Sequence, residues 1–537
     1  MIQSHLLRVE QELLLLRLES VKTTYHQNLG CMDGTREFLL KQLRGWAAKE
    51  PEQKEDGNTY WIYGLPGIGK TSLAHSICAS LHEDSQLAGA FFCRRDDVNL
   101  SEPRNILPTL IHKLAIIFPP FRRLVAERLR NDPNLAPTSM KDTLLLELVR
   151  KLPRIPKCTH IFVIDALDEC GNTKTRPSIL RALTDSVKHA SWLKVIITSR
   201  PEVDIEHFFN SLTQSSHLRY DLTSDRETTS DLRIFAQARF NAVASERYIQ
   251  VPWPEQSLLD KVVSQAAGLF IFVETIALAL EHCKDPTEYL KATLHDSAGT
   301  GLSSLYKLYS SILNTRRVHD VIEFRRVIGV LLAAAPYHPL CDETIAQLAG
   351  VRPDLVKMWA ADLSSLLYRD EGADGGIRVR HLSISDFFLR DDCPSEYHID
   401  LQEVNVDLGM ACLDTMIEQL RFNICKLEDS RLTNAEVKDL PLRIKENLSD
   451  TLQYSSMYWS DHLCHISEKD DKQVLGHLRK FFEGPYGLFW VEALSVMGMV
   501  SIGVPSLRRV ISTVVKVRTS AMVLDCKVNL IWCRRPT

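Results

Sequence analysis

The chain has 537 residues, of which 45% are hydrophobic and 25% charged, a composition typical of globular proteins with room for about three or four domains. Its net charge of −4 gives no general attraction to nucleic acid or to anionic membranes. The 13 cysteines include no Cys-x-x-Cys pair. We therefore expect reduced thiols in a cytoplasmic protein rather than a zinc site or a disulfide framework.

The first predicted element is a short N-terminal helix over residues 1–24. Apolar residues recur in it at spacings of four and three, at Ile2, Leu6, Val9, Leu13 and Leu16. This spacing fits either a helix that packs on the next domain or a short coiled-coil seam. We favour the packed helix, because the pattern covers barely two heptads.

A glycine-rich stretch follows the first predicted strand, residues 60–63. It fits the pattern G-x-x-x-x-G-K-[ST] with Gly64, Leu65, Pro66, Gly67, Ile68, Gly69, Lys70 and Thr71, followed by Ser72. Glycine lacks a Cβ atom, so the backbone can take positive φ and turn its N–H groups around an anion at the start of a helix. Lys70 would reach the outer phosphates of a nucleotide, and the Thr71 hydroxyl suits Mg²⁺. A glycine-rich turn without a ligand is the alternative.

Strands and helices alternate from there to residue 222. The predicted strands cover residues 60–63, 89–93, 160–165, 193–199 and 218–222. The third and fourth are nearly continuous apolar runs, which is typical of parallel strands covered on both faces. We predict an α/β P-loop NTPase domain with a doubly wound parallel sheet over residues 25–222.

Acidic residues follow the third strand. Asp165 stands at its carboxyl end, where open α/β sheets bind ligands, and would hold Mg²⁺ opposite Thr71. Asp168 and Glu169 occupy the next turn, where a carboxylate can orient and deprotonate a water molecule. A helix-capping acidic loop is the alternative interpretation.

Arg200 follows the fourth strand, within Thr-Ser-Arg-Pro. A guanidinium at this position can contact a γ-phosphate and stabilise developing charge. The alternative is an ion pair with a neighbouring acid. The predicted catalytic residues are therefore Asp168, Glu169 and Arg200.

Strands nearly vanish after residue 222. We predict four further regions: a helical domain (223–300), a winged-helix domain (301–395), an α-helical region (396–510) and an undefined tail (511–537). The winged-helix prediction depends on helices that precede a short β pair around Tyr368 and residues 377–379. An apolar stretch, 487–504, carries Glu492 over barely a spanning length, which favours a buried helix over a transmembrane span.

Several segments together resemble the NACHT-type signal-transduction NTPases of the STAND class. They are the P-loop, CMDGTR (31–36), GAFFCRRDD (89–97), FVIDALDEC (162–170), AAGLFIFVETIA (266–277), RHLSISDFF (380–388), YSSMYWSDHL (454–463) and LFWVEALSVMG (488–498). The chain is most similar to fungal members related to vegetative incompatibility proteins and to the nephrocystin-type domain. The resemblance implies that His381 reaches the β-phosphate of a bound diphosphate and holds a closed form. It also implies that the turn Gly268–Phe270 lies near the base.

The same resemblance implies a cytoplasmic molecular switch. Diphosphate would hold the chain closed, exchange for triphosphate with Mg²⁺ would permit assembly into a homo-oligomer, and slow hydrolysis would reset it. No Asn-Lys-x-Asp guanine signature occurs, which favours ATP, although GTP stays open. The alternatives are a constitutive P-loop ATPase or nucleotide kinase, and a nucleotide-bound scaffold that does not hydrolyse. No nucleic-acid or membrane partner is expected, and the sequence predicts neither the protein effector nor the sensor.

Overall fold

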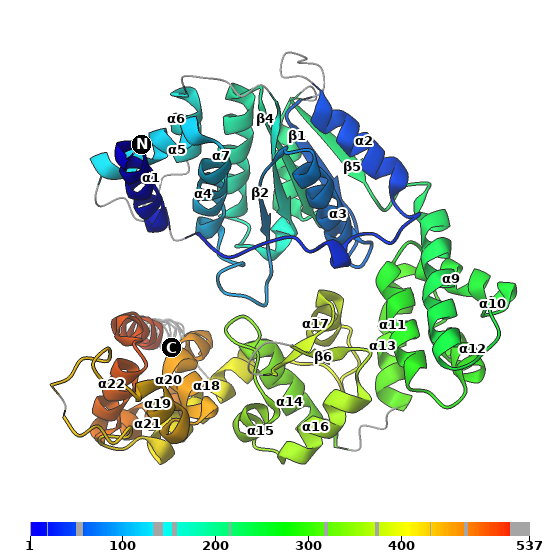
Figure 1. Cartoon of the computed structure of the whole chain (residues 1–537). Coiled ribbons are helices and arrows are strands. Elements are labelled where there is room, and N and C mark those ends of the chain that lie inside the picture. Colours follow the sequence, from blue (N-terminus) through cyan, green and yellow to red (C-terminus); the bar gives the residue numbers. More distant parts are fainter. Residues whose placement is uncertain are drawn as a thin grey trace, which may run out of the picture. The chain divides into compact units, whose positions relative to one another are not determined.

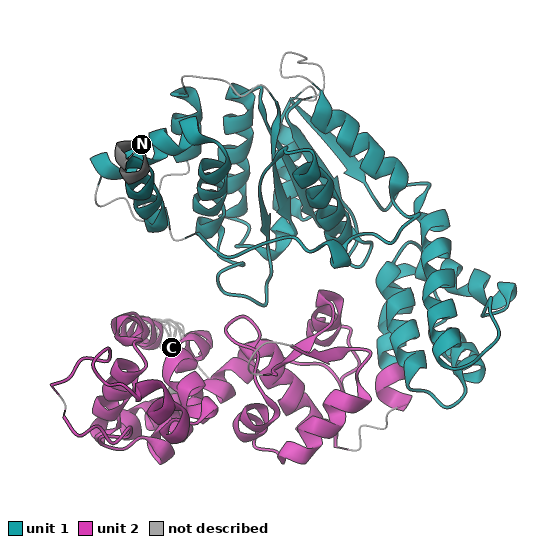
Figure 2. Cartoon of the chain, viewed as in Figure 1, with its two compact units in different colours: residues 1–311 teal, residues 312–537 magenta. Residues whose placement is uncertain are grey.

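The structure is a computed structural model that describes residues 2–18, 20–49, 57–132, 143–152, 158–213, 216–315, 320–370, 375–429, 431–466 and 471–515 (Figure 1). The chain divides into two compact units, residues 1–311 and 312–537 (Figure 2).

A five-stranded parallel sheet forms the centre of the first unit. Its strands are β1 (Thr59–Tyr63), β2 (Leu87–Phe92), β3 (His160–Asp165), β4 (Leu193–Ser199) and β5 (His217–Asp221). They lie in the order β2-β3-β4-β1-β5, and every neighbouring pair is parallel. The predicted parallel sheet is thus confirmed, with strand ends shifted by at most two residues.

Helices cover both faces of this sheet (Figure 1). They are α2 (Glu37–Ala48), α3 (Lys70–Glu83), α4 (Ile106–Ile117), α5 (Pro119–Asn131), α6 (Leu144–Arg150), α7 (Arg176–His189) and α8 (Val203–Ser211). Phe162 and Ile164 of β3 join residues of α4, α5 and α7 in one core cluster. The alternate side chains of β3 face the other way, where α3 contacts the strand. This double cover explains why every residue of β3 and β4 is buried.

The strand order brings three loops to one edge of the sheet. β4 lies between β1 and β3, and all three strands run in the same direction. The residues that follow them, 64–69, 166–169 and 200–202, therefore meet at the carboxyl edge. This edge is where open parallel sheets place their ligands.

The N-terminal helix α1 (Ile2–Leu15) packs on α5, as one of the two interpretations predicted. Its packing face differs from the predicted stripe. Leu15 and the following Leu18 are buried, whereas three members of the stripe are exposed: Val9, Leu13 and Leu16. Four consecutive leucines occupy positions 13–16, so spacing alone does not decide which face packs.

A polar anchor sets the orientation of this helix. Arg17 donates to the backbone oxygens of Leu129 and Asp132, at 2.6 and 3.0 Å, where α5 ends. These carbonyls have no partner within their own helix, so a basic side chain satisfies them well. This anchor turns Leu15 and Leu18 toward the core.

Five helices complete the first unit. They are α9 (Thr228–Glu246), α10 (Gln256–Ala266), α11 (Phe270–Glu281), α12 (Pro286–Asp296) and α13 (Gly301–Thr315). α9 contacts both α10 and α11. The boundary between the two units falls inside α13.

The second unit is mainly helical. Its helices are α14 (Val321–Ala334), α15 (Asp342–Ala349), α16 (Pro353–Asp362), α17 (Leu382–Leu389), α18 (Leu401–Gln419), α19 (Leu440–Asn447), α20 (Asp450–His462), α21 (Asp471–Glu483) and α22 (Tyr486–Val496). The predicted β pair is present as β6 (Leu367–Arg369) and β7 (Ile377–Val379), which are antiparallel. The sequence also predicts a turn between them over residues 372–376, of which 372–374 lie outside the described residues. Residues 503–515 are also helical, and the rest of the predicted tail is outside the description.

The apolar stretch 487–504 forms a shorter and more exposed helix than predicted. α22 ends at Val496, and Gly498 follows with a φ of 73°. Trp490 is buried, but Leu488 is 77% exposed. The expected buried helix is thus correct for one face only. Across the residues that the structure describes, no helix is both long and apolar enough to cross a membrane.

Candidate nucleotide-binding site

The glycine-rich loop joins β1 to α3 at the carboxyl edge of the sheet. Gly67 and Gly69 have φ values of 78° and 95°, which a residue with a Cβ atom rarely adopts. Gly64 does not have a positive φ. A Cβ atom there would lie 3.2 Å from the Cβ of Leu222 and 3.3 Å from the Thr223 hydroxyl. Gly64 therefore allows close packing on the segment after β5, which is a different role from the expected turn.

The other loop residues are placed as the pattern predicts. Leu65, Pro66 and Ile68 complete the loop, and Ile68 is buried. Thr71 and Ser72 lie in the first turn of α3. The free N–H groups of this turn give the loop a partial positive charge.

Lys70 is buried beneath the loop. Its ammonium donates to the backbone oxygens of Gly64 and Leu65, at 2.8 and 2.9 Å. Burial lowers the pKa of Lys70 to about 8, and the nearby carboxylates, with Asp168 foremost, oppose this shift. The lysine thus carries its charge at neutral pH at the place where the pattern puts phosphate.

Asp165 ends β3 and is held by two hydroxyl groups. Thr71 donates to one of its oxygens at 2.8 Å, and Thr198 of β4 donates to the other at 2.5 Å. Burial raises the pKa of Asp165, and these two hydrogen bonds oppose the rise. The predicted pair Thr71 and Asp165 is therefore in direct contact.

Asp168 is tied to Arg200. It accepts a hydrogen bond from the Arg200 backbone N–H at 2.9 Å, and its other oxygen lies 3.3 Å from the Arg200 Nε. Arg200 thus forms an ion pair with a neighbouring acid, which was the alternative prediction for this residue. Arg176 supports the arrangement, because it donates to the Asp168 carbonyl and forms a two-pronged ion pair with Asp204.

Glu169 is held more loosely. One of its oxygens accepts the Arg95 backbone N–H at 3.3 Å. Burial raises the pKa of Glu169 to about 7, and the charge of Asp168 adds to the rise. This pKa of Glu169 suits proton transfer at neutral pH.

The turn Gly268–Phe270 lies beside the glycine-rich loop. The backbone N–H of Ile271 donates to the Gly67 carbonyl at 3.2 Å. A Cβ atom on Gly69 would lie 3.9 Å from the Phe270 ring. The helical segment that starts at α9 therefore contacts the loop directly. That this turn lies near a base stays a prediction.

His381 belongs to the second unit, where it caps α17. Its Nδ1 accepts the backbone N–H of Ser383 at 3.1 Å. In the neutral ring the proton therefore lies on Nε2, which makes that nitrogen a donor. Its contact with a phosphate stays a prediction.

Two residues at this edge carried no role in the sequence analysis. Thr198 was part of the Thr-Ser-Arg-Pro motif, and its position on a strand next to β3 was the signal that it could reach Asp165. Arg36 was part of the CMDGTR motif. Its side chain is buried and contacts the glycine-rich loop, which no local pattern indicates.

Comparison with known proteins agrees with this geometry. Residues 34–200 match the family model described as Nephrocystin 3, N-terminal, which spans β1 to β4 and the first residue after them. The chain is 26% identical over 533 aligned residues to the vegetative incompatibility protein HET-E-1 of Podospora anserina. The predicted resemblance to these NACHT-type proteins is confirmed.

The match to HET-E-1 covers 91% of this chain but 37% of that protein, so this chain spans little more than a third of its relative. Two solved structures are also similar. A STAND protein with a tetratricopeptide repeat sensor from Pyrococcus horikoshii is 15% identical, over 93% of this chain and 67% of that one, with a TM-score of 0.38. A Walker-type ATPase of Pyrococcus abyssi is 13% identical, over 65% and 94% of the two chains, with a TM-score of 0.30.

Proposed function

We propose that this NACHT-type chain is a nucleotide-dependent molecular switch that binds ATP or GTP with Mg²⁺ and hydrolyses it slowly. The observation that carries the proposal is the meeting of Lys70, the Thr71–Asp165 pair and Glu169 at one edge of the parallel sheet. These groups have the chemistry that phosphate binding and water activation need.

Binding would use the loop backbone and Lys70. The positive φ values at Gly67 and Gly69 suit a loop whose N–H groups face an anion. Lys70 would exchange its two carbonyl partners for phosphate oxygens, which form stronger, charge-assisted hydrogen bonds.

The residues beside the loop fit Mg²⁺. Mg²⁺ prefers oxygen ligands and is commonly held by one or two protein groups together with substrate phosphates. The Thr71 hydroxyl and the Asp165 carboxylate are such a pair, and they already lie 2.8 Å apart. When bound, the ion supplies positive charge that stabilises the phosphate oxygens.

Glu169 and Arg200 would act on the γ-phosphate side. Glu169, with its raised pKa, would accept a proton from the attacking water. Asp168 would hold Arg200 in place, and Arg200 would stabilise the charge that develops on the phosphate. Asp168 then orients the arginine instead of competing as the base.

The switch itself would involve the second unit. We propose that α14–α17 with β6 and β7 form a winged-helix domain, and that His381 contacts the β-phosphate of a diphosphate in a closed state. The triphosphate state would self-associate and signal in the cytoplasm, in non-self recognition or programmed cell death of a fungus. The similarity to a vegetative incompatibility protein and the free thiols of all described cysteines support this setting.

The experiment compares nucleotide binding by the parent and by Lys70→Ala, with labelled ATP and labelled GTP in separate titrations. Lys194→Ala is a matched control. Lys194 is also buried and bonded to two backbone oxygens, those of Trp46 and Lys49, but it lies away from the loop. We expect Lys70→Ala to abolish binding and Lys194→Ala to retain it. Equal affinities of the parent and Lys70→Ala would overturn the assignment of the loop.

The turnover of the parent separates the alternatives. A constitutive ATPase or nucleotide kinase would turn over at about 1 s⁻¹ or faster, as dedicated enzymes do. A scaffold would bind nucleotide without hydrolysing it. A switch should hydrolyse nucleotide slowly. Fast turnover would contradict the switch, and so would the complete absence of hydrolysis.

A further inference from the structure

Arg36 is a buried arginine just before α2. It has a φ of 57°, which is uncommon for a residue with a side chain, and Gly34 before it has a φ of 82°. This reversal of the chain turns the Arg36 side chain inward, where it is 3% exposed. A guanidinium buried to this degree needs partners for its five N–H groups.

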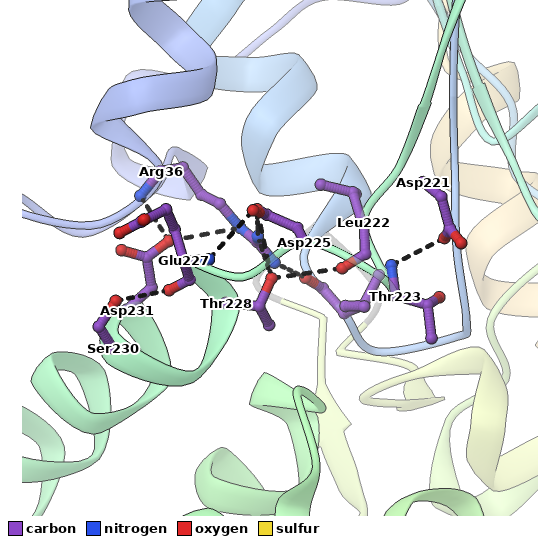
Figure 3. A network of polar contacts seen from close by, with 10 residues as sticks. Arg36, Asp221, Leu222, Thr223, Asp225, Glu227, Thr228, Ser230 and Asp231 are labelled. Atoms are coloured by element: carbon purple, nitrogen blue, oxygen red, sulfur yellow. Dashed lines mark hydrogen bonds and ion pairs between the residues drawn. The ribbon is translucent and has the colours of Figure 1, made fainter.

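Several partners of Arg36 lie in one segment that is far from it in the sequence (Figure 3). Its Nη1 donates to Asp225 at 3.0 Å and to the Thr228 hydroxyl at 2.6 Å, and its backbone N–H donates to Asp231 at 3.1 Å. These three residues lie in the turn before α9 and in its first turns. The guanidinium carbon also lies 5.3 Å from the centre of the Phe270 ring, at the start of α11.

The Arg36 Nε also lies 4.0 Å from the Asp231 carboxylate, and a further contact of Arg36 reaches the glycine-rich loop. Its Nη2 donates to the Ile68 carbonyl at 2.9 Å. The Ile68 carbonyl and the Gly69 N–H belong to one planar peptide unit, in which they point in opposite directions. A donor that fixes the carbonyl on the outside of the loop therefore fixes the direction of the N–H on its other side.

A second contact of the same kind lies one peptide earlier. The Ile271 backbone N–H donates to the Gly67 carbonyl, whose peptide unit contains the Ile68 N–H. Two successive peptide planes of the loop are thus held from outside by the helical segment. The Arg36 side chain forms hydrogen bonds with both the loop and that segment.

We propose that Arg36 is a positioning residue, which orients the Gly69 N–H toward the phosphates and couples that orientation to the placement of α9 and α11. Two measurements test this inference, and one of them depends on the proposed nucleotide binding. Arg36 itself does not touch the nucleotide in this account. Its substitution alters the loop while leaving Lys70, Thr71 and Asp165 in the chain.

The test compares Arg36→Met with Arg239→Met. Arg239 also joins α9 to α11, through an ion pair with Glu274 at 2.7 Å, but has no hydrogen bond or ion pair with the loop. We measure the affinity for labelled diphosphate at a temperature at which both variants are folded. Arg36→Met should weaken binding by about 10- to 100-fold, as small displacements of a binding group do. Arg239→Met should bind like the parent.

Amide hydrogen exchange in the nucleotide-free protein is the second measurement. Arg36→Met should speed exchange in peptides that cover residues 64–69, whereas Arg239→Met should not. If the parent fails to bind nucleotide, the proposed function fails, and faster exchange confined to this loop still supports the role of Arg36. If Arg36→Met changes neither the affinity nor the exchange, the proposed role of Arg36 is overturned. An equal loss of affinity in Arg36→Met and Arg239→Met also overturns this role.

Two milder variants cover the case in which Arg36→Met does not fold. Arg36→Lys keeps the charge but lacks the fork that reaches Ile68, Asp225 and Thr228 together, so its affinity should lie between those of the parent and Arg36→Met. Thr228→Val removes one acceptor of the guanidinium and should weaken diphosphate binding in the same direction by a smaller factor. Parent-like affinity in both of these variants would overturn the proposal.

Discussion

At the scale of single residues, burial at the carboxyl edge of the sheet moves two pKa values toward neutrality from opposite sides. The pKa of Glu169 rises to about 7, and that of Lys70 falls to about 8. The same low-dielectric surroundings act on both groups, because burial disfavours whichever form is charged. The edge therefore combines a carboxylate that can take up a proton with a cation that can hold phosphate.

These pKa values predict the pH dependence of hydrolysis. Only deprotonated Glu169 can accept a proton from water, so kcat/KM should rise with pH through a midpoint of about pH 7. Only protonated Lys70 attracts phosphate, so kcat/KM should fall again above about pH 8. Steady-state hydrolysis in buffers of constant ionic strength measures both limbs.

The variant Glu169→Gln tests whether Glu169 causes the rise of kcat/KM with pH. The variant should bind triphosphate and Mg²⁺ as the parent does, but hydrolyse it about tenfold or more slowly, because it loses the proton acceptor. Its rate should no longer rise through pH 7. A variant that keeps the parent's rate and pH profile would show that Glu169 is not the base.

At the scale of elements, the α1 helix shows how far a spacing pattern determines packing. Leu18 is fully buried, whereas Leu16, a member of the predicted stripe, is 68% exposed. Leu18→Ala should lower the free energy of unfolding by about 2–5 kcal/mol, the usual cost of removing a buried leucine side chain. Leu16→Ala should change it by less than about 0.5 kcal/mol. Urea unfolding of both variants decides between the two faces, and the reverse ranking would contradict the packing described here.

The sheet was predictable from sequence because its signals are local. The P-loop motif follows β1, an acid ends the apolar run of β3, and a third apolar run leads into Thr-Ser-Arg-Pro at β4; all five predicted strands lie within two residues of the observed ones. An acid that shares an ion with a P-loop is expected to lie close to it, and Thr71 and Asp165 are in contact. The order of the strands was not predicted, because β4 lies between β1 and β3 and no local signal indicates this.

The contacts that hold the loop from outside were not predictable in the same way. Arg36 meets Asp225 across 189 residues of chain and Ile68 across 32, so no periodicity links them. The role of Gly64 was also hidden, because a pattern shows where glycine stands but not whether it serves φ or close packing. Such features depend on which segments the fold brings together.

At the scale of the whole molecule, the proposed switch needs a group in the second unit that senses the nucleotide. His381 has the required chemistry, since its Nδ1 accepts the Ser383 N–H and its Nε2 can donate. A single charge-assisted hydrogen bond from His381 to a diphosphate would stabilise the closed state by about 1.5–3 kcal/mol. The closed state would thereby be favoured without any change at Glu169.

His381→Ala should therefore favour the open state. Loss of that hydrogen bond raises the open population by roughly 10- to 150-fold. Diphosphate should dissociate faster, while the chemical step stays nearly unchanged. The control is His338→Ala, since His338 is an exposed histidine of the same unit. Dissociation rates of labelled diphosphate that agree within about twofold for parent and His381→Ala would assign His381 to packing alone.

Sedimentation velocity of the parent protein tests the switch most directly. One sample contains diphosphate, and the other contains Mg²⁺ with a triphosphate analogue that is not hydrolysed. The proposed switch predicts a slowly sedimenting single chain with diphosphate and a faster, concentration-dependent species with the analogue, because only the triphosphate state would expose the surface for self-association. The same sedimentation coefficient in both samples, at nucleotide concentrations that saturate the site, would contradict a nucleotide-controlled assembly.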